Sequence, residues 1–224
     1  MDRLKIGDTA AVGRSSRASG FAFAPQRMTS WLALIVACAA VWMSPASLAA
    51  ARVPRIALTV RVYQTVRLPS ALAQQALAEA ETVLLAGHVD VQWKQCTGLN
   101  SSATCDAPPG PSELLLAVRE GTRCQDRSST LGRAWVIRRG GGKLATVYVN
   151  CVARLATAAG TDVAVLLGRV AAHELGHLMM RTSAHPRRGL MRPHWTPDEV
   201  RRNLAADWAF TASDVTGMHQ PGTQ

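Results

Sequence analysis

Two histidines and one glutamate stand close together in the string HELGH, at His173, Glu174 and His177. On an α-helix, residues four apart lie one above the other, so the two imidazoles would be about 5 to 6 Å apart at Cβ. Two imidazole nitrogens at that separation can bind one Zn²⁺ at about 2.0 to 2.1 Å. Glu174 would point away from the metal yet stay close enough to take a proton from a metal-bound water. The spacing predicts two metal ligands and a general base.

A catalytic zinc site needs a third protein ligand and an open fourth position. The candidates are His185, eight residues after His177, and the more distant His194 and Glu199. His185 is favoured because the chain between the two histidines could turn back toward the helix. Glu199 has another explanation, since Thr196 to Glu199 is typical of a helix-capping box. His194 has the alternative of a surface or cleft residue.

The histidines and the glutamate lie in a segment, Asp162 to Met180, that is apolar nearly all round. Such a segment is typical of a helix buried at the centre of a domain. Buried histidines and a buried carboxyl group are costly without a partner. A metal ion is therefore favoured over satisfied core histidines or a chance string.

The rest of the pattern predicts the elements that position this helix. Alternating apolar residues predict strands at 55–63, 88–96, 113–120, 135–139 and 144–152, the last two paired across the glycines at 140–142. An Ala- and Leu-rich stretch predicts a helix from Ser70 to Gly87, and Thr196 and Thr211 each begin a later helix, the first running to about Ala206. This order predicts an α+β fold, with a small mixed sheet packed on a backing helix and a buried helix, and a short C-terminal helical part.

The N-terminal region has the features of a secretory signal peptide. Its apolar run at 31–43, WLALIVACAAVWM, is shorter than the roughly 20 residues that span a membrane. A basic leader precedes the run and small residues follow it, which predicts cleavage near Ala49 or Ala50. We therefore expect a leader at 1–50, a single catalytic domain at 51–224, and a periplasmic or extracellular location without stable membrane insertion after processing. A start at Met28, lipid anchoring at Cys38 and an uncleaved anchor are the alternatives.

Cleavage would remove Cys38 and leave an even set of cysteines in an oxidising compartment. Two disulfides are therefore expected. Of the three possible pairings we favour Cys96 with Cys105 and Cys124 with Cys151. A structural zinc site made from these cysteines is less favoured, because no CxxC spacing occurs.

The composition is basic, with 25 Lys and Arg against 15 Asp and Glu. The arginines are scattered and lack interleaved aromatic residues, so the pattern argues against nucleic-acid binding. The expected partner is a peptide or protein substrate, and the sequence does not predict an oligomeric state.

The stretch HELGHLMMRTSAHPRRGLM, residues 173–191, resembles the metzincin group of zinc peptidases. In that group HExxH is followed by a third histidine and by a methionine-containing turn beneath the metal. The resemblance implies a zincin-like fold, Zn²⁺ as the cofactor, His173, His177 and His185 as ligands, Glu174 as the base and Met191 in the turn. It also implies that the strand at 144–152 is the sheet edge that binds the substrate backbone.

The chain departs from the family pattern in ways that indicate a compact, divergent member. The third histidine usually follows the second by six residues, with a glycine between them, whereas here the gap is eight and Met180 takes the place of that glycine. Met191 follows unusually soon and has the alternative of a core-filling residue. No tyrosine comes shortly after Met191 to stabilise the oxyanion, so that role is open, with His194 as a candidate.

The sequence as a whole predicts an exported zinc metalloendopeptidase that hydrolyses peptide bonds through a zinc-bound water, with Glu174 as the general base. One alternative is a zinc amidase acting on a non-protein substrate. Another is a catalytically silent, zinc-stabilised binding module. Asp207 or Asp214 would orient a ligand histidine, or would be a solvent-facing helix charge.

Overall fold

The computed structural model describes residues 54–96, 103–122, 124, 130–137 and 142–220. All of them belong to the unit Ala49–Gln224. The predicted leader, with Cys38 and the cleavage site, and most of the predicted glycine turn at 140–142 lie outside the described residues.

The α+β fold expected from the sequence is confirmed. Its strands are β1 Ile56–Gln64, β2 Val89–Gln95, β3 Glu113–Arg119, β4 Gly132–Ala134 and β5 Leu144–Tyr148. Its helices are α1 Ser70–Ala86, α2 Ala103–Asp106, α3 Val149–Ala159, α4 Val163–Met180, α5 Pro197–Arg202, the 3₁₀ helix η1 Ala205–Trp208, and α6 Ala212–His219.

The strands form one mixed sheet in the order β2-β1-β3-β5-β4. β1 pairs in parallel with β2 and β3, and β3 pairs in parallel with β5, while β4 is antiparallel to β5 at the edge. Parallel neighbours need a crossover connection, which α1 supplies between β1 and β2. Because side chains alternate across a strand, Leu58, Val60 and Val62 of β1 all lie buried on one face.

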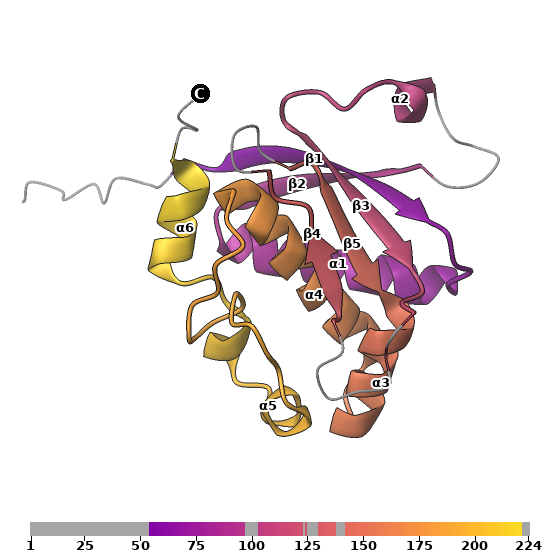
Figure 1. The fold of residues 1–224 in the computed structure, drawn as a ribbon, viewed down its shortest axis with the longest axis vertical. Coiled ribbons are helices and arrows are strands. Elements are labelled where there is room, and N and C mark those ends of the chain that lie inside the picture. Colours follow the sequence, from indigo (N-terminus) through magenta and orange to yellow (C-terminus); the bar gives the residue numbers. More distant parts are fainter. Residues whose placement is uncertain (1–53, 97–102, 123, 125–129, 138–141, 221–224) are drawn as a thin grey trace, which may run out of the picture. The chain divides into compact units, whose positions relative to one another are not determined.

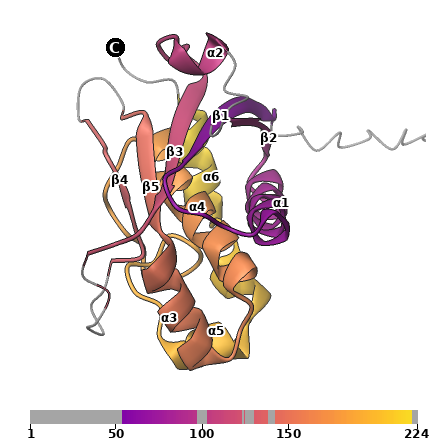
Figure 2. The same ribbon diagram turned by 90° about the vertical axis from the view of Figure 1, so that its right-hand side faces the viewer.

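α1 and α4 lie together on one face of the sheet, as Figures 1 and 2 show. The side of α1 that carries Ala76, Ala80 and Val83 is buried. α4 is long and apolar enough to cross a membrane by composition, but 78% of it is buried inside the fold. It is the buried core helix that the sequence predicts.

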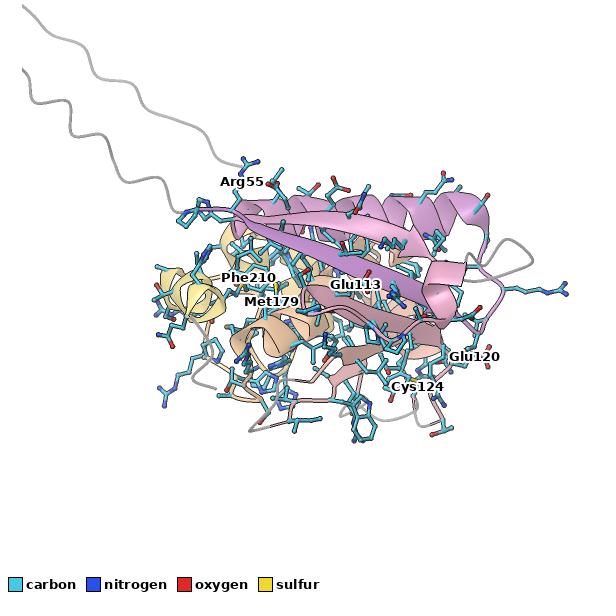
Figure 3. All side chains as sticks on the ribbon, turned by 90° about the horizontal axis from the view of Figure 1, so that it is seen from above. Arg55, Glu113, Glu120, Cys124, Met179 and Phe210 are labelled. Atoms are coloured by element: carbon cyan, nitrogen blue, oxygen red, sulfur yellow. A yellow bond between two sulfur atoms is a disulfide. The ribbon has the colours of Figure 1, made fainter. Side chains whose placement is uncertain are left out.

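Both predicted disulfides are present, Cys96–Cys105 and Cys124–Cys151. The first joins α2 to the end of β2, and the Tyr63 hydroxyl of β1 donates to the Cys105 carbonyl at 2.8 Å. Figure 3 shows Glu113 on the sheet and Phe210 near α6. The Glu113 carboxylate accepts a hydrogen bond from Arg61 of the neighbouring strand β1.

Three predicted boundaries are wrong. The strand predicted at 144–152 ends at Tyr148, and α3 begins at the next residue. The β-branched run there resembles a strand, but the buried residues of α3 recur at helical spacing, and Asn150 accepts from the Gly121 amide at 2.8 Å. Long-range contacts thus override local strand propensity.

The partner strand lies at 132–134 instead of 135–139, and pairing ends where the Trp135 amide donates to the Leu144 carbonyl at 2.9 Å. The helix predicted from Thr196 to about Ala206 stops at Arg202, because Asn203 adopts a left-handed conformation with φ 49°. Asn tolerates that conformation better than most residues.

Close packing of α4 on α1 depends on Gly168. A Cβ at this position would lie 2.8 Å from the Glu79 Cβ and 2.9 Å from the Ala80 amide nitrogen. We expect Gly168→Ala to lower the free energy of unfolding by about 1–2 kcal/mol, because an overpacking cost of up to about 3 kcal/mol outweighs the helix gain of about 1 kcal/mol. Urea unfolding measures it.

Gly217→Ala in α6 is the matched control, since its Cβ would meet only the Met180 side chain, at an ordinary 3.4 Å. The control should keep or slightly raise the stability. Equal stability of wild type and Gly168→Ala would contradict this account of the α1–α4 contact.

Candidate metal centre

α4 carries His173 and His177 one turn apart, both buried, at 8% and 5% exposure. The Asp162 side chain caps the start of this helix by accepting from the Ala164 amide at 2.6 Å. Four-residue spacing places both imidazoles on the same side of the helix. Their Nε2 atoms lie 3.0 Å apart.

The chain turns back after α4 and brings His185 to the same place. Arg181 ends the helix in a left-handed conformation with φ 55°, and the Thr182 amide donates to the His177 carbonyl at 3.2 Å. The Nε2 of His185 lies 3.0 Å from the Nε2 of His177. One ligand atom from each of the three histidines lies within 4.8 Å of the others, a group that could hold one metal ion.

Hydrogen bonds fix the protonation of two of the rings. The Nδ1 of His173 lies 2.8 Å from the Leu190 carbonyl, and the Nδ1 of His177 lies 2.8 Å from the Thr182 carbonyl. A carbonyl oxygen only accepts, so each Nδ1 donates, and each neutral ring presents an Nε2 lone pair. Two lone pairs that face each other repel unless a cation lies between them.

Electrostatics keep these rings in the metal-binding form. Burial, and then the neighbouring His177, lower the pKa of His173 to about 3, and burial also lowers the pKa of His177 and of His185. Neutral imidazole is the form that binds a metal. Two ligands at tetrahedral zinc stand about 3.3 Å apart. The two 3.0 Å separations from His177 are close to this value, and all three ligand atoms lie within 4.8 Å of one another, a spacing at which one ion could be held.

Asp207 and Asp214, which the sequence suggested as groups that orient a ligand histidine, make other contacts. Asp214 accepts from the Thr211 amide at 2.8 Å, and an Asp207 carboxylate oxygen lies 3.7 Å from Arg192. Main-chain carbonyls orient the histidines instead. Sequence reasoning missed them, because every residue has a carbonyl and only the fold decides which one faces an imidazole.

Glu174 lies on the same helix, buried at 6% exposure beneath the edge strand β4. A Cβ on Gly132 would come within 2.6 Å of its carboxylate, so this strand can pass only without a side chain there. Burial raises the pKa of Glu174 to about 8, against the opposing effects of a backbone hydrogen bond from Ala134 and the charge of Arg133. In the sequence, the one signal for the contact between β4 and Glu174 is the glycine at position 132.

The predicted substrate edge is therefore wrong, since β4 covers β5 and is itself the outer strand. β4 pairs with the outer side of β5, so β5 is not at the edge of the sheet. The second half of the 144–152 segment is helical and belongs to α3.

The other candidates lie elsewhere. Glu199 accepts from the Thr196 amide at 2.8 Å as part of a capping box, and is not in the histidine group. His194 is exposed, and its charge contributes to lowering the pKa of His185. Met191 is fully buried, and its sulfur lies 2.9 Å from where a Cβ on Gly176, the residue before His177, would be.

No protein-family model and no curated protein matches this chain. Solved structures that resemble it include archaemetzincin from Methanopyrus kandleri, at 20% identity and TM-score 0.42, covering 75% of this chain and 95% of that one. Another is a zinc-dependent peptidase from Methanocorpusculum labreanum (strain Z), at 16% identity and TM-score 0.45, covering 71% and 99%. Both similarities are distant, so the assignment of the metal centre depends on this chain's own histidines.

Removal of any one of the three histidines should abolish tight zinc binding. We expect His173→Ala, His177→Ala and His185→Ala each to lose the stoichiometric zinc that wild type retains after dialysis, because two imidazoles hold zinc weakly. Elemental analysis measures this. His194→Ala and Glu199→Ala are the controls and should keep one zinc per chain. If His194→Ala or Glu199→Ala lost its zinc while one of the three histidine variants kept it, this ligand set would be contradicted.

Glu174 should make the metal-free protein less stable as the pH rises. Its pKa is 4.5 unfolded and about 8 folded, so unfolding releases a proton between these pH values, and stability falls through that window. Glu174→Gln has no such group and should be more stable than wild type at pH 9 by the order of a few kcal/mol, but not near pH 4. Urea unfolding in chelator measures both. A pH-independent difference would contradict the buried-carboxyl assignment.

Proposed function

We propose that this chain is an exported zinc metalloendopeptidase in which His173, His177 and His185 bind the metal. The observation that carries the proposal is that a ligand nitrogen from each of three histidines lies within 4.8 Å of the others, beside a helix that also carries a buried carboxyl group. Three protein ligands that leave a fourth position open are typical of catalytic rather than structural zinc.

Zinc bound here would supply an acidified water and polarise the scissile carbonyl. Glu174 takes the proton of the attacking water and delivers it to the leaving amine. Burial raises the pKa of Glu174 to about 8 in the metal-free protein, and a bound dication nearby would lower it again and favour the carboxylate that accepts the proton. His194, exposed beside His185, is proposed as the donor to the oxyanion.

The proposed substrate is an extended peptide that adds to the edge of β4. Edge strands bind peptides through main-chain hydrogen bonds, and β4 is the outer strand next to Glu174. A peptide bound in this way continues in both directions past the site, which supports internal cleavage.

Export is supported by the two disulfides, which persist in oxidising compartments. The proposal includes removal of residues 1–50 as a signal peptide and function of residues 51–224 as one catalytic domain in the periplasm or outside the cell.

Glu174→Gln is the sharpest test of the chemistry. The variant should keep one zinc per chain and lose about 10²- to 10⁴-fold in peptide hydrolysis, because proton transfer has no acceptor. Hydrolysis of a mixed library of unstructured peptides, read by mass spectrometry, measures it. Glu81→Gln, on the exposed side of α1, is the matched control and should keep wild-type activity.

The peptide assay, run beside a second assay on non-peptide amides, separates the alternatives. A zinc-loaded wild type that cleaves non-peptide amides but no peptide would indicate an amidase. One that cleaves neither would indicate a binding module, and either result would refute the peptidase proposal.

A further inference from the structure

The segment that supplies the third histidine has no regular secondary structure of its own. Residues 182–196, between α4 and α5, carry His185 and also the Leu190 carbonyl that accepts from His173 at 2.8 Å. Two contacts of the metal centre therefore depend on how this irregular segment is fastened to α4.

A cluster of buried aromatic and cationic side chains lies where the segment meets α4. The Trp208 cluster consists of Arg169, Arg192, Trp195 and Trp208. The guanidinium carbon of Arg169 lies 4.3 Å from the centre of the Trp208 ring, and that of Arg192 lies 5.2 Å from it. Both arginines and Trp208 are buried, at 8% exposure or less. Two like charges thus share one aromatic ring inside the protein.

Each arginine is tied to a different part of the fold. Arg169, one turn before His173 on α4, donates to Glu79 of α1 at 2.8 Å and to the Asn203 side chain at 2.7 Å. Arg192, directly after Met191, donates to the Asp207 carbonyl at 2.8 Å. The Trp208 ring joins these two anchors, and so joins the irregular segment to the helix of the metal site.

The cluster also reaches a metal-site ring directly. Trp195 packs edge-on against Trp208, with ring centres 5.0 Å apart, and edge-on against His173, with ring centres 5.6 Å apart. The contacts form an unbroken path from Arg169 through Trp208 and Trp195 to His173.

The Trp208 cluster includes buried polar atoms that are costly to bury. Among the described residues, the Nε and Nη2 of Arg192 and the indole nitrogens of Trp195 and Trp208 have no hydrogen-bond partner. Buried donors without acceptors are costly, and apolar replacement of buried charges is often neutral or stabilising. The indole nitrogen of Trp93 on β2 is unpaired in the same way, so the contacts that link the cluster to His173, and not its unpaired donors, carry the inference.

We propose that Arg192 and Trp208 are positioning residues for the metal, which hold the irregular segment 182–196 against α4 so that the three imidazoles stay close enough to bind one ion. The inference rests on the metal site of the proposed function but not on its hydrolytic chemistry. It distinguishes these residues from ordinary core residues, whose loss would lower stability and leave metal affinity unchanged.

The test compares Arg192→Met and Trp208→Leu with wild type in two measurements. Zinc Kd is measured by competition with a chromophoric chelator, and the visible spectrum of the Co²⁺-loaded protein reports ligand geometry. We expect zinc Kd to weaken about tenfold to hundredfold, as for other groups that orient metal ligands, and the tetrahedral Co²⁺ bands to shift or lose intensity. The melting temperature of each variant in chelator reports stability separately.

Two further variants serve as controls. Trp208→Phe keeps an aromatic face for both guanidinium groups and should stay within about threefold of the wild-type zinc Kd. Trp93→Leu removes a partly buried tryptophan from β2 and should lower the melting temperature without changing zinc Kd. If Trp208→Leu does not fold, Arg192→Met carries the comparison alone.

Folded Arg192→Met and Trp208→Leu proteins with wild-type zinc Kd and Co²⁺ spectra would overturn the positioning role while leaving the metal site standing. A wild type that binds no zinc would instead contradict the metal site itself, and the positioning role would fall with it.

Discussion

Mutual repulsion between imidazole lone pairs is the constraint on which the rest of this structure depends. The Nε2 atoms of His173 and His185 each lie 3.0 Å from that of His177, and two of the three rings are locked by carbonyls in the tautomer that points a lone pair inward. Such an arrangement is stable when a cation neutralises it. The sheet, the buried helix and the returning segment are best understood as the means of keeping these nitrogens together.

Burial and close packing follow from that constraint. α4 is enclosed on nearly every side, which buries His173 and His177 and makes an unpaired charge there costly, while the third histidine, His185, is exposed. Small residues allow the enclosure: Gly168 brings α1 close, Gly176 makes room for Met191 and Phe210, and Gly132 lets the edge strand pass over Glu174. The close packing around α4 also buries the Glu174 carboxyl group, and this burial raises its pKa.

The sequence predicts well where the signal is local. Asp162 to Met180 is recognisable as a buried helix, and the cysteine count led to both disulfides. His185 lies beside His173 and His177, and its role as the third ligand stays a prediction. Predictions failed where distant contacts decide: β-branched residues at 147–149 indicate a strand, but the chain turns into α3 there. The edge position of β4, the orienting carbonyls and the Trp208 cluster have no local signature.

The most direct measurement is X-ray absorption at the zinc edge of the purified, zinc-loaded protein. The account predicts a first shell of three imidazole nitrogens and one water oxygen at about 2.0–2.1 Å, with outer-shell scattering from three rings. Sulfur scattering at about 2.3 Å, or only two imidazoles in the shell, would contradict the three-histidine centre.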